Sequence, residues 1–249
     1  MNSFFVINGS KMKRGLLVVL VAFFTALFVY TQTVSTTTVF KTDNGTRAVY
    51  SGKDGIALTF NIGWGDKQAV PIIEQLVSEN VKQATFFLSG SWAERHPDTV
   101  ELIKKSGFEI GSLGYAYVDY TDLPDDKIKR DILKSQEVFT KLNVKDVKLL
   151  RTPTGHFNEK VISISDKLGF SLIHWSITTD DWKNPGVDKI VENASKTKKG
   201  DIVLLHASDA AKQTSKALPE ILNKLKNKGE FVTVSTLLSN GNIKTKLVP

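Results

Sequence analysis

The chain contains no cysteine, which excludes disulfide bonds and metal sites built on thiolates. This absence is compatible with export in bacteria that make little use of disulfides. Histidine is scarce as well, and His96, His156 and His174 lack the spacing of a metal-binding pair. We expect surface or capping roles for His96 and His156 and assign no role to His174, which lies within a predicted strand.

The chain also lacks the basic runs and the basic patches interleaved with aromatic residues that nucleic-acid-binding proteins show, although its net charge is +7. A nucleic-acid partner is therefore not expected. Hydrophobic residues make up 41% and charged residues 24%, which excludes wholesale disorder and a polytopic membrane protein. The 249 residues suffice for one α/β domain and a short appendage.

One long uncharged stretch stands near the N-terminus, from Gly15 to Tyr30, directly after Lys11, Lys13 and Arg14. Its helical length of about 24 Å is short of a hydrocarbon core of roughly 30 Å, so flanking residues must complete a crossing. The basic cluster predicts a cytoplasmic N-terminus. We therefore expect a single-pass protein of the cell membrane whose folded domain is extracytoplasmic.

A cleaved signal peptide is the alternative for this segment, because its apolar length also fits one. The absence of a clear Ala-x-Ala site favours an uncleaved anchor. The predicted organisation is a cytoplasmic N-terminus, an anchor or signal, a linker, a folded domain and a C-terminal tail, over residues 1–14, 15–34, 35–52, 53–240 and 241–249.

Beyond the linker, short β-rich runs alternate with amphipathic segments, which is typical of βαβ units and a parallel sheet. The expected strands are Ile56–Asn61, Ala84–Ser89, Phe108–Ser112, Val147–Leu150, Ser171–Ser176, Ile202–His206 and Phe231–Val234. The expected helices span 69–79, 97–105, 125–142, 159–168, 187–195 and 217–228, and Gly107, Gly169 and Gly229 follow three of them. The predicted fold is an irregular seven-stranded (β/α) barrel, complete or with a missing sector, whose chemistry lies at the carboxyl ends of the strands.

Five short segments at those strand ends resemble, in order and spacing, the motifs of the polysaccharide deacetylase family, or NodB homology domain. They are Thr59–Gly63, Gly111–Tyr117, Arg151–Gly155, Asp181–Trp182 and Leu204–His206. Residues 85–87 and 91–97 also look like the sporulation-associated, PdaB-type branch of the family. The resemblance implies an N-acetylated cell-wall glycan such as peptidoglycan as the partner.

In this family the first motif carries an aspartate base and an aspartate that binds Zn²⁺ or Co²⁺, and the second motif supplies two histidines to the metal. Here Asn61 stands at the base, Ile62 at the metal aspartate, and Leu113 and Tyr117 at the histidines. The amide of Asn61 cannot act as a base, and the hydrocarbon and phenol side chains at the other three positions cannot bind Zn²⁺ or Co²⁺. No metal cofactor is therefore expected. Asp66 could supply one carboxylate if its loop folded back, but we expect it to be solvated or to cap a helix.

The rest of the family's groove is present. The resemblance implies that Arg151 orients the group at position 61, that Asp181 pairs with His206, and that Trp182 and Leu204 form an apolar wall. The candidate catalytic residues are thus Asn61, Arg151, Asp181 and His206, and the candidate substrate-binding residues are Trp64, Thr154, Trp182 and Leu204. Aromatic side chains suit the apolar faces of sugar rings. Tyr115 and Tyr117 are therefore expected on the same face of the domain as Trp64 and Trp182, whereas Trp175 is expected in the core.

Three functions remain open from the sequence. The replaced positions favour a glycan-binding protein of weak or absent hydrolytic activity. The alternative is an active carbohydrate N-deacetylase, an amide hydrolase with a modified mechanism. An adaptor that acts through its anchor and surface helices has no specific support in the sequence.

Overall fold

The structure is a computed structural model, and it describes residues 19–25, 41–42, 45–239 and 243–246. The chain divides into two compact units, residues 1–39 and 40–249. In the first unit residues 19–25 are helical, and most of the predicted anchor over 15–34 lies outside the described residues. Among the residues that are described, no helix combines the length and hydropathy that a membrane crossing needs. The transmembrane helix therefore stays a prediction.

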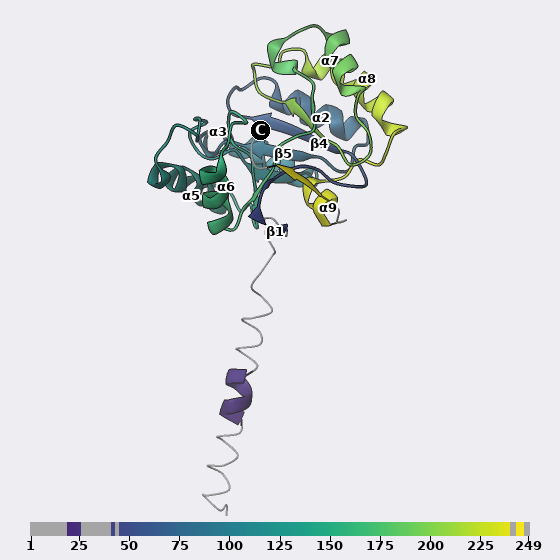
Figure 1. The fold of residues 1–249 in the computed structure, drawn as a ribbon. Helices are drawn as coiled ribbons and strands as arrows, with labels where there is room; N and C mark the ends of the chain where they lie inside the picture. The colour runs from purple at the N-terminus through teal and green to yellow at the C-terminus, as the bar shows by residue number, and fades with distance from the viewer. Residues whose placement is uncertain (1–18, 26–40, 43–44, 240–242, 247–249) are drawn as a thin grey trace, which may run out of the picture. The chain divides into compact units, whose positions relative to one another are not determined.

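The second unit is built on one parallel sheet of seven strands. In spatial order these are β8 (Ser171–Leu172), β7 (Leu149–Leu150), β6 (Glu109–Ser112), β5 (Thr85–Leu88), β4 (Ala57–Ile62), β10 (Ile202–His206) and β9 (Ile177–Thr178). The α/β class is as predicted, and six of the seven predicted strands correspond to strands of this sheet, whereas β9 was not predicted. The sheet is curled and open, with β8 and β9 as its two edges (Figure 1).

The missing sector of the barrel lies where one continuous strand was predicted over Ser171–Ser176. The backbone N–H of Ile173 bonds the carbonyl of Leu150, but that of Ser176 bonds Ile202 on the other side of the gap. Between them, the N–H of His174 bonds the carbonyl of Val49. This stretch therefore crosses from one sheet edge to the other and cannot continue a ladder with either.

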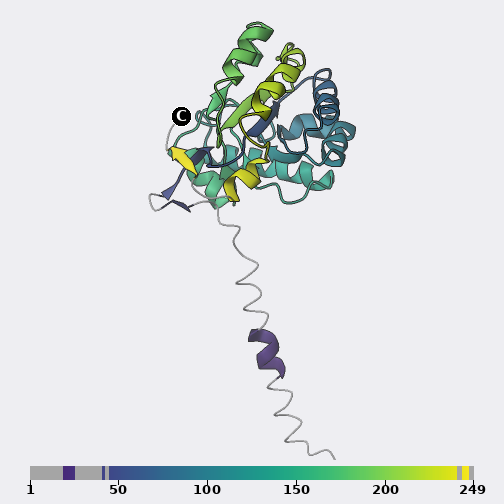
Figure 2. The ribbon, with the colours of Figure 1, turned by 90° about the vertical axis from the view of Figure 1, so that its right-hand side faces the viewer.

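Helices cover the outer side of the sheet, and most begin and end within three residues of the prediction. They are α2 (Ala69–Ser78), α3 (Gly90–Arg95), α4 (Pro97–Lys105), α5 (Asp125–Lys141), α6 (Glu159–Lys167), α7 (Val187–Ala194) and α8 (Thr214–Lys226). Figures 1 and 2 show α7 beside α8 at one end of the sheet, with α5 and α6 at the other end. Gly107 and Gly169 follow α4 and α6 with φ of 76° and 78°, the left-handed conformation of a helix C-terminus.

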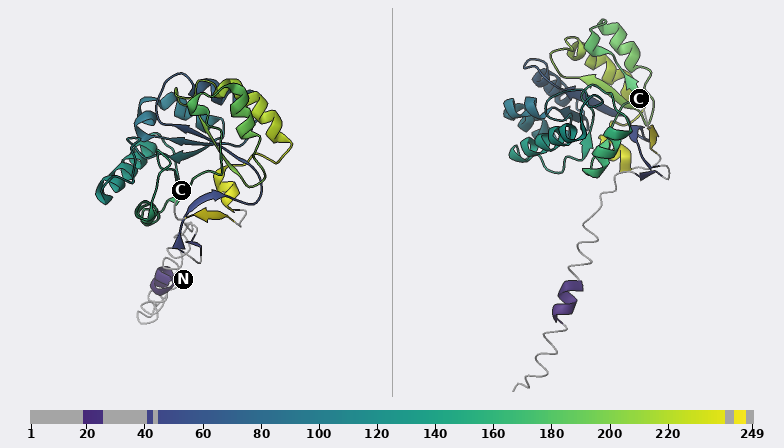
Figure 3. Two further views of the ribbon diagram at one scale, coloured as in Figure 1. Left: turned by 45° about the horizontal axis from the view of Figure 1, so that its top comes forward. Right: turned by 60° about the vertical axis from the view of Figure 1, so that its left-hand side comes forward.

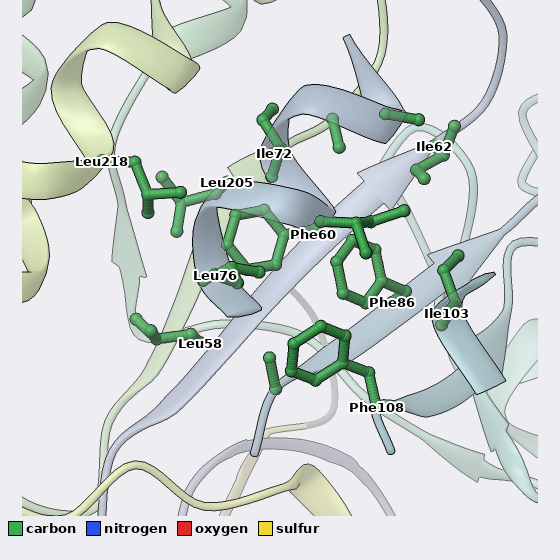
Figure 4. Close-up of a cluster of buried hydrophobic side chains, with 14 of the residues drawn as sticks. Leu58, Phe60, Ile62, Ile72, Leu76, Phe86, Ile103, Phe108, Leu205 and Leu218 are labelled. Carbon is green, nitrogen blue, oxygen red and sulfur yellow. The ribbon is translucent and has the colours of Figure 1, made fainter. Parts of the chain in front are cut away.

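The central strand β4 separates two environments, because its side chains alternate between the faces of the sheet. Leu58, Phe60 and Ile62 belong to the main hydrophobic cluster between sheet and helices, where Phe60 stacks on Phe86 at 5.1 Å (Figure 4). Thr59 and Asn61 occupy the alternate positions of the strand and are also buried. This alternation directs Asn61 to the concave side of the curled sheet.

The prediction of a strand over Phe231–Val234 is wrong. Phe231 forms only an isolated bridge to Ile56, and Val234 already begins α9 (Val234–Ser239). The cause is local, because the Thr233 hydroxyl accepts a hydrogen bond from the N–H of Thr236 at 3.1 Å and caps the helix. Helix α3 was not predicted, and Ser89 caps it in the same way through the N–H of Trp92.

Parts of the predicted linker and tail are ordered with the domain. Strand β3 (Ala48–Ser51) is buried and pairs with β11 (Lys244–Lys246) in an antiparallel ribbon, which Figure 3 shows in blue and yellow. Val49 also bridges to Ile173 at the sheet edge. Residues from both ends of the domain thus lie beside the opening in the barrel.

Candidate functional site

A cavity of about 460 Å³ lies at the carboxyl ends of β4, β9 and β10, where the fold places the chemistry of a (β/α) barrel. Six of the eight candidate residues line it, namely Asn61, Trp64, Thr154, Trp182, Leu204 and His206. The other two, Arg151 and Asp181, are fully buried directly behind this lining. The strand-end motifs therefore converge on one site.

Asp181 and His206 form a hydrogen-bonded pair. The Nδ1 atom of His206 lies 2.8 Å from Oδ1 of Asp181, and the backbone N–H of His206 donates to Oδ2 at 2.7 Å. Asp181 also accepts from the Thr214 hydroxyl at 2.7 Å and from the N–H of Trp182 at 2.9 Å. Four donors thus hold a carboxylate that is completely buried, and this carboxylate fixes the imidazole ring at the cavity wall.

Arg151 and Asn61 form the second buried pair. Nη1 of Arg151 donates to Oδ1 of Asn61 at 2.8 Å and to Oγ1 of Thr59 at 3.0 Å. Nη2 donates to the carbonyl of His174 at 3.0 Å, and Nε to that of Ile173 at 3.4 Å. In the described residues, all acceptors of hydrogen bonds from this guanidinium are neutral groups.

The charge of Arg151 is therefore buried without an acidic partner in the described residues. Burial lowers the pKa of its guanidinium to about 9. The ring of Phe87 partly compensates, since the guanidinium carbon lies 4.0 Å from the ring centroid. Gly111 makes room for this ring, because a Cβ there would lie 2.6 Å from it.

The three residues expected from the sequence at the family's metal positions do not fit a metal ion. Ile62 belongs to the cluster between sheet and helices, and Leu113 is buried in another cluster against which Tyr117 packs. None of the three supplies a carboxylate or imidazole. Tyr117 covers the backbone of Gly63, where a Cβ would approach its ring to 2.5 Å, and burial raises the pKa of its hydroxyl. Across the described ranges, no three histidine, aspartate or glutamate side chains are grouped so that they could hold a metal.

Asp66 does not replace the missing carboxylate. Its side chain is 80% exposed and lies 2.7 Å from Nε2 of His96, outside the cavity lining. Asp209 instead stabilises the loop before α2, because it accepts the backbone N–H groups of residues 66, 67 and 68 at 2.9 to 3.1 Å. Burial opposes ionisation of Asp209, but these three donors outweigh it and lower its pKa. The sequence carried no sign of this contact, because the two segments are more than 140 residues apart.

Aromatic side chains form the walls of the cavity. Trp64 and Trp182 line it and are about half exposed, as platforms for a sugar ring require. Trp175, expected in the core, lines the cavity too, because its segment crosses the gap between the sheet edges. Tyr115 lies outside the lining, where its hydroxyl donates to Glu94 and Lys134 sits over its ring at 3.6 Å.

Thr154 is held at the cavity rim by Asp119. Its hydroxyl donates to Oδ2 of Asp119 at 3.0 Å, and Nδ1 of His156 lies 2.6 Å from the same oxygen. Partial burial opposes ionisation of Asp119, but its hydrogen bonds from Thr121, His156 and Thr154 prevail and hold its pKa well below the usual range. His156 is a surface residue, as expected, whereas His174 is buried and stacks on Tyr50 and Trp175.

Comparison with known proteins agrees with this geometry. The family profile described as polysaccharide deacetylase matches residues 48–173. The chain belongs to the polysaccharide deacetylase family. A peptidoglycan-N-acetylglucosamine deacetylase of Bacillus cereus is 39% identical over 188 residues, which are 74% of this chain and 87% of that protein. The peptidoglycan-N-acetylglucosamine deacetylase PgdA of Listeria monocytogenes is 33% identical over 73% of this chain and 38% of its own length.

Solved structures share the fold. A protein of Bacillus anthracis, described as a CE4 family pseudoenzyme, superposes with a TM-score of 0.71 at 29% identity, over 78% of this chain and 69% of that one. A mutant of that protein, described as having restored enzymatic activity, gives 0.72 at 28% identity over 78% and 72% of the two chains. The family therefore includes a member described as a pseudoenzyme.

Proposed function

We propose that this protein binds N-acetylated cell-wall glycan through the cavity and has weak or no hydrolytic activity. The observation that carries the proposal is the pair of Arg151 and Asn61 at the floor of the cavity. The amide of Asn61 already uses its oxygen to accept from Arg151, and an amide does not take a proton from water at neutral pH. General-base catalysis from this position is thereby absent.

The lack of metal ligands supports the same conclusion. A metal ion polarises a carbonyl and lowers the pKa of bound water, and each effect supplies several kcal/mol of transition-state stabilisation. Ile62, Leu113 and Tyr117 offer no ligand set for such an ion. The walls needed to hold a sugar are retained, because Trp64, Trp182 and Leu204 line the cavity.

The second candidate function is a carbohydrate N-deacetylase with a modified mechanism. The hydrogen-bonded pair of Asp181 and His206 favours it, since a carboxylate-oriented imidazole can protonate a departing amine. Without a base and a metal, however, this pair acts on only one of the two proton transfers of amide hydrolysis.

The proposed site of action is the outer face of the cell membrane. The support is the uncharged segment from Gly15 to Tyr30, which follows a basic cluster. The resemblance to sporulation-associated family members is the support for a proposed role in spore formation. Protease treatment of intact protoplasts tests the topology. Cleavage of the folded domain only after lysis would reverse the orientation, and recovery of the protein outside the membrane fraction would favour the cleaved signal peptide.

The test of function combines three measurements on one preparation of the full-length protein. We expect binding of N-acetylglucosamine oligomers by calorimetry, no stoichiometric Zn²⁺ or Co²⁺ by elemental analysis, and little or no acetate release from peptidoglycan fragments. Trp182→Ala is the matched control for the site, and it should weaken oligomer binding because one of the two exposed platforms is lost. Rapid acetate release would establish the second function instead.

A further inference from the structure

The orientation of the Asn61 side chain is fixed by its neighbour. Arg151 is a donor only, so the Asn61 atom at 2.8 Å from its Nη1 must be the oxygen. The NH₂ group of Asn61 then lies on the other branch of the amide. This NH₂ group has no hydrogen-bond partner in the described part of the chain, and Asn61 lines the cavity, so the donor is available to a ligand. A deacetylase would present an accepting carboxylate at this position, whereas this chain presents a donor.

His206 lies next to this donor. Asn61 and His206 are register partners in the parallel strands β4 and β10, so their side chains leave the sheet at the same level. Since Nδ1 of His206 is bound to Asp181, Nε2 is its remaining polar atom. Leu204 and Trp182 complete the same cavity with apolar surface. A donor beside an apolar wall matches an acetamido group, whose carbonyl accepts and whose methyl is apolar.

The electrostatics of the cavity disfavour the deacetylated form of the same sugar. Its ammonium group can only donate, and it would meet the NH₂ of Asn61 and, behind it, the buried charge of Arg151. Asp180 is the acid in the lining of this cavity, but Lys183 lies 3.2 Å from its carboxylate and offsets its charge. The buried carboxylate of Asp181 also lies behind the lining, but its hydrogen bonds go to His206, Trp182 and Thr214, so it is not a direct partner for the ammonium. The guanidinium cannot turn to serve a ligand, because its four hydrogen bonds go to the protein.

We propose that the cavity distinguishes the acetylation state of the glycan, with the Asn61 amide nitrogen donating to the carbonyl of an intact N-acetyl group. This inference rests on the proposed glycan binding and assigns its specificity to one residue. Arg151 is a positioning residue that holds the amide in the donating orientation. A protein of this kind distinguishes unmodified wall glycan from glycan that a deacetylase has already processed.

The experiment compares two ligands that differ only at nitrogen. The full-length protein is titrated at pH 7 with the tetramer of N-acetylglucosamine and with the fully deacetylated tetramer. We expect the acetylated tetramer to bind at least about tenfold more tightly, which corresponds to one hydrogen bond gained and one charge repulsion avoided. Acetate is measured in parallel to verify that the acetylated ligand stays intact.

Variants separate specificity from affinity. Asn61→Asp replaces the donor by a carboxylate and should abolish or reverse the preference, and Arg151→Met should lower it because the amide is released. Trp64→Ala removes a platform that is not part of the apolar wall of Leu204 and Trp182, so it should weaken both tetramers by a similar factor and leave their ratio unchanged.

The outcomes are distinct. If neither tetramer binds, the proposed glycan binding fails and this inference fails with it. If the wild-type protein binds both tetramers equally, only the discrimination by acetylation is overturned, and this result needs no variant. If folded Asn61→Asp keeps the wild-type ratio, Asn61 is not the determinant. A ratio of about tenfold that is lost in Asn61→Asp and kept in Trp64→Ala supports the proposal.

Discussion

Nη1 of Arg151 lies 2.8 Å from Oδ1 of Asn61, so a completely buried guanidinium donates to a neutral amide at the floor of the cavity. A cation in such a place is ordinarily paired with a carboxylate, because an unpaired buried charge is strongly destabilising. The arrangement has consequences both for stability and for the chemistry that the site can perform.

The first prediction concerns the coupling between these two residues. Arg151→Met should be far more harmful in the Asn61→Asp background than in the wild type, because only there does it strand a buried carboxylate. We expect a coupling free energy of at least about 2 kcal/mol in a double-mutant cycle measured by urea unfolding at pH 7. A coupling free energy below about 0.5 kcal/mol would mean that the two side chains do not interact as the structure shows.

The second prediction concerns Asp181. Asp181→Asn replaces one of the two accepting oxygens by an NH₂ group, so two of the four hydrogen bonds lose their acceptor and the free energy of unfolding should fall by roughly 2 to 4 kcal/mol. Asp180→Asn is the matched control at the adjacent position, where the ion pair is partly exposed and the loss should stay under about 1 kcal/mol. If the free energy of unfolding fell equally in the two variants, the hydrogen bonds of Asp181 would not stabilise the fold more than the partly exposed ion pair of Asp180.

The third prediction is a pH dependence at Asp209. The folded chain lowers the pKa of this carboxyl, so its stabilising effect is present above the unfolded pKa of about 3.9 and is lost as the pH falls through the folded value. The difference in unfolding free energy between wild type and Asp209→Asn should therefore narrow from about pH 7 to about pH 3. Asp54→Asn, at an exposed position, serves as control and should show a small difference at either pH.

The fourth prediction concerns the metal site. A variant with aspartate in place of Asn61 and Ile62 and histidine in place of Leu113 and Tyr117 should bind about one Zn²⁺ per chain. Turnover should recover far less, because the orientation of ligands, water and carbonyl depends on surrounding contacts that four substitutions do not rebuild. A mutant of the Bacillus anthracis pseudoenzyme is described as having restored enzymatic activity.

The control for this variant keeps Tyr117 and changes only the other three positions, which should weaken Zn²⁺ binding markedly. Because Ile62 lies in the main hydrophobic cluster, both variants must first be shown to fold by circular dichroism. A folded quadruple variant without metal would mean that these positions do not correspond to the family's first two motifs.

Local pattern in the sequence was sufficient for the class of the fold, and the resemblance to the family's motifs selected the candidate residues. Apolar alternation in β4 and amphipathic spacing in helices such as α5 reflect burial, which acts on each residue whatever its distant partners. Residues at the ends of parallel strands must gather at one edge of the sheet, so the strand pattern by itself placed Asn61, Leu204 and His206 together.

The tertiary structure alone decided what depends on curvature and on contacts between distant segments. The gap between β8 and β9 turned one predicted strand into a crossing and brought Trp175 to the cavity. The family resemblance implied the pairing of Arg151 with Asn61, but nothing in the sequence indicated that Asp209 reaches the loop before α2 across more than 140 residues. A sequence pattern records which side chains avoid water, but the partner of a buried polar group is set by where the folded chain places the nearest donor or acceptor.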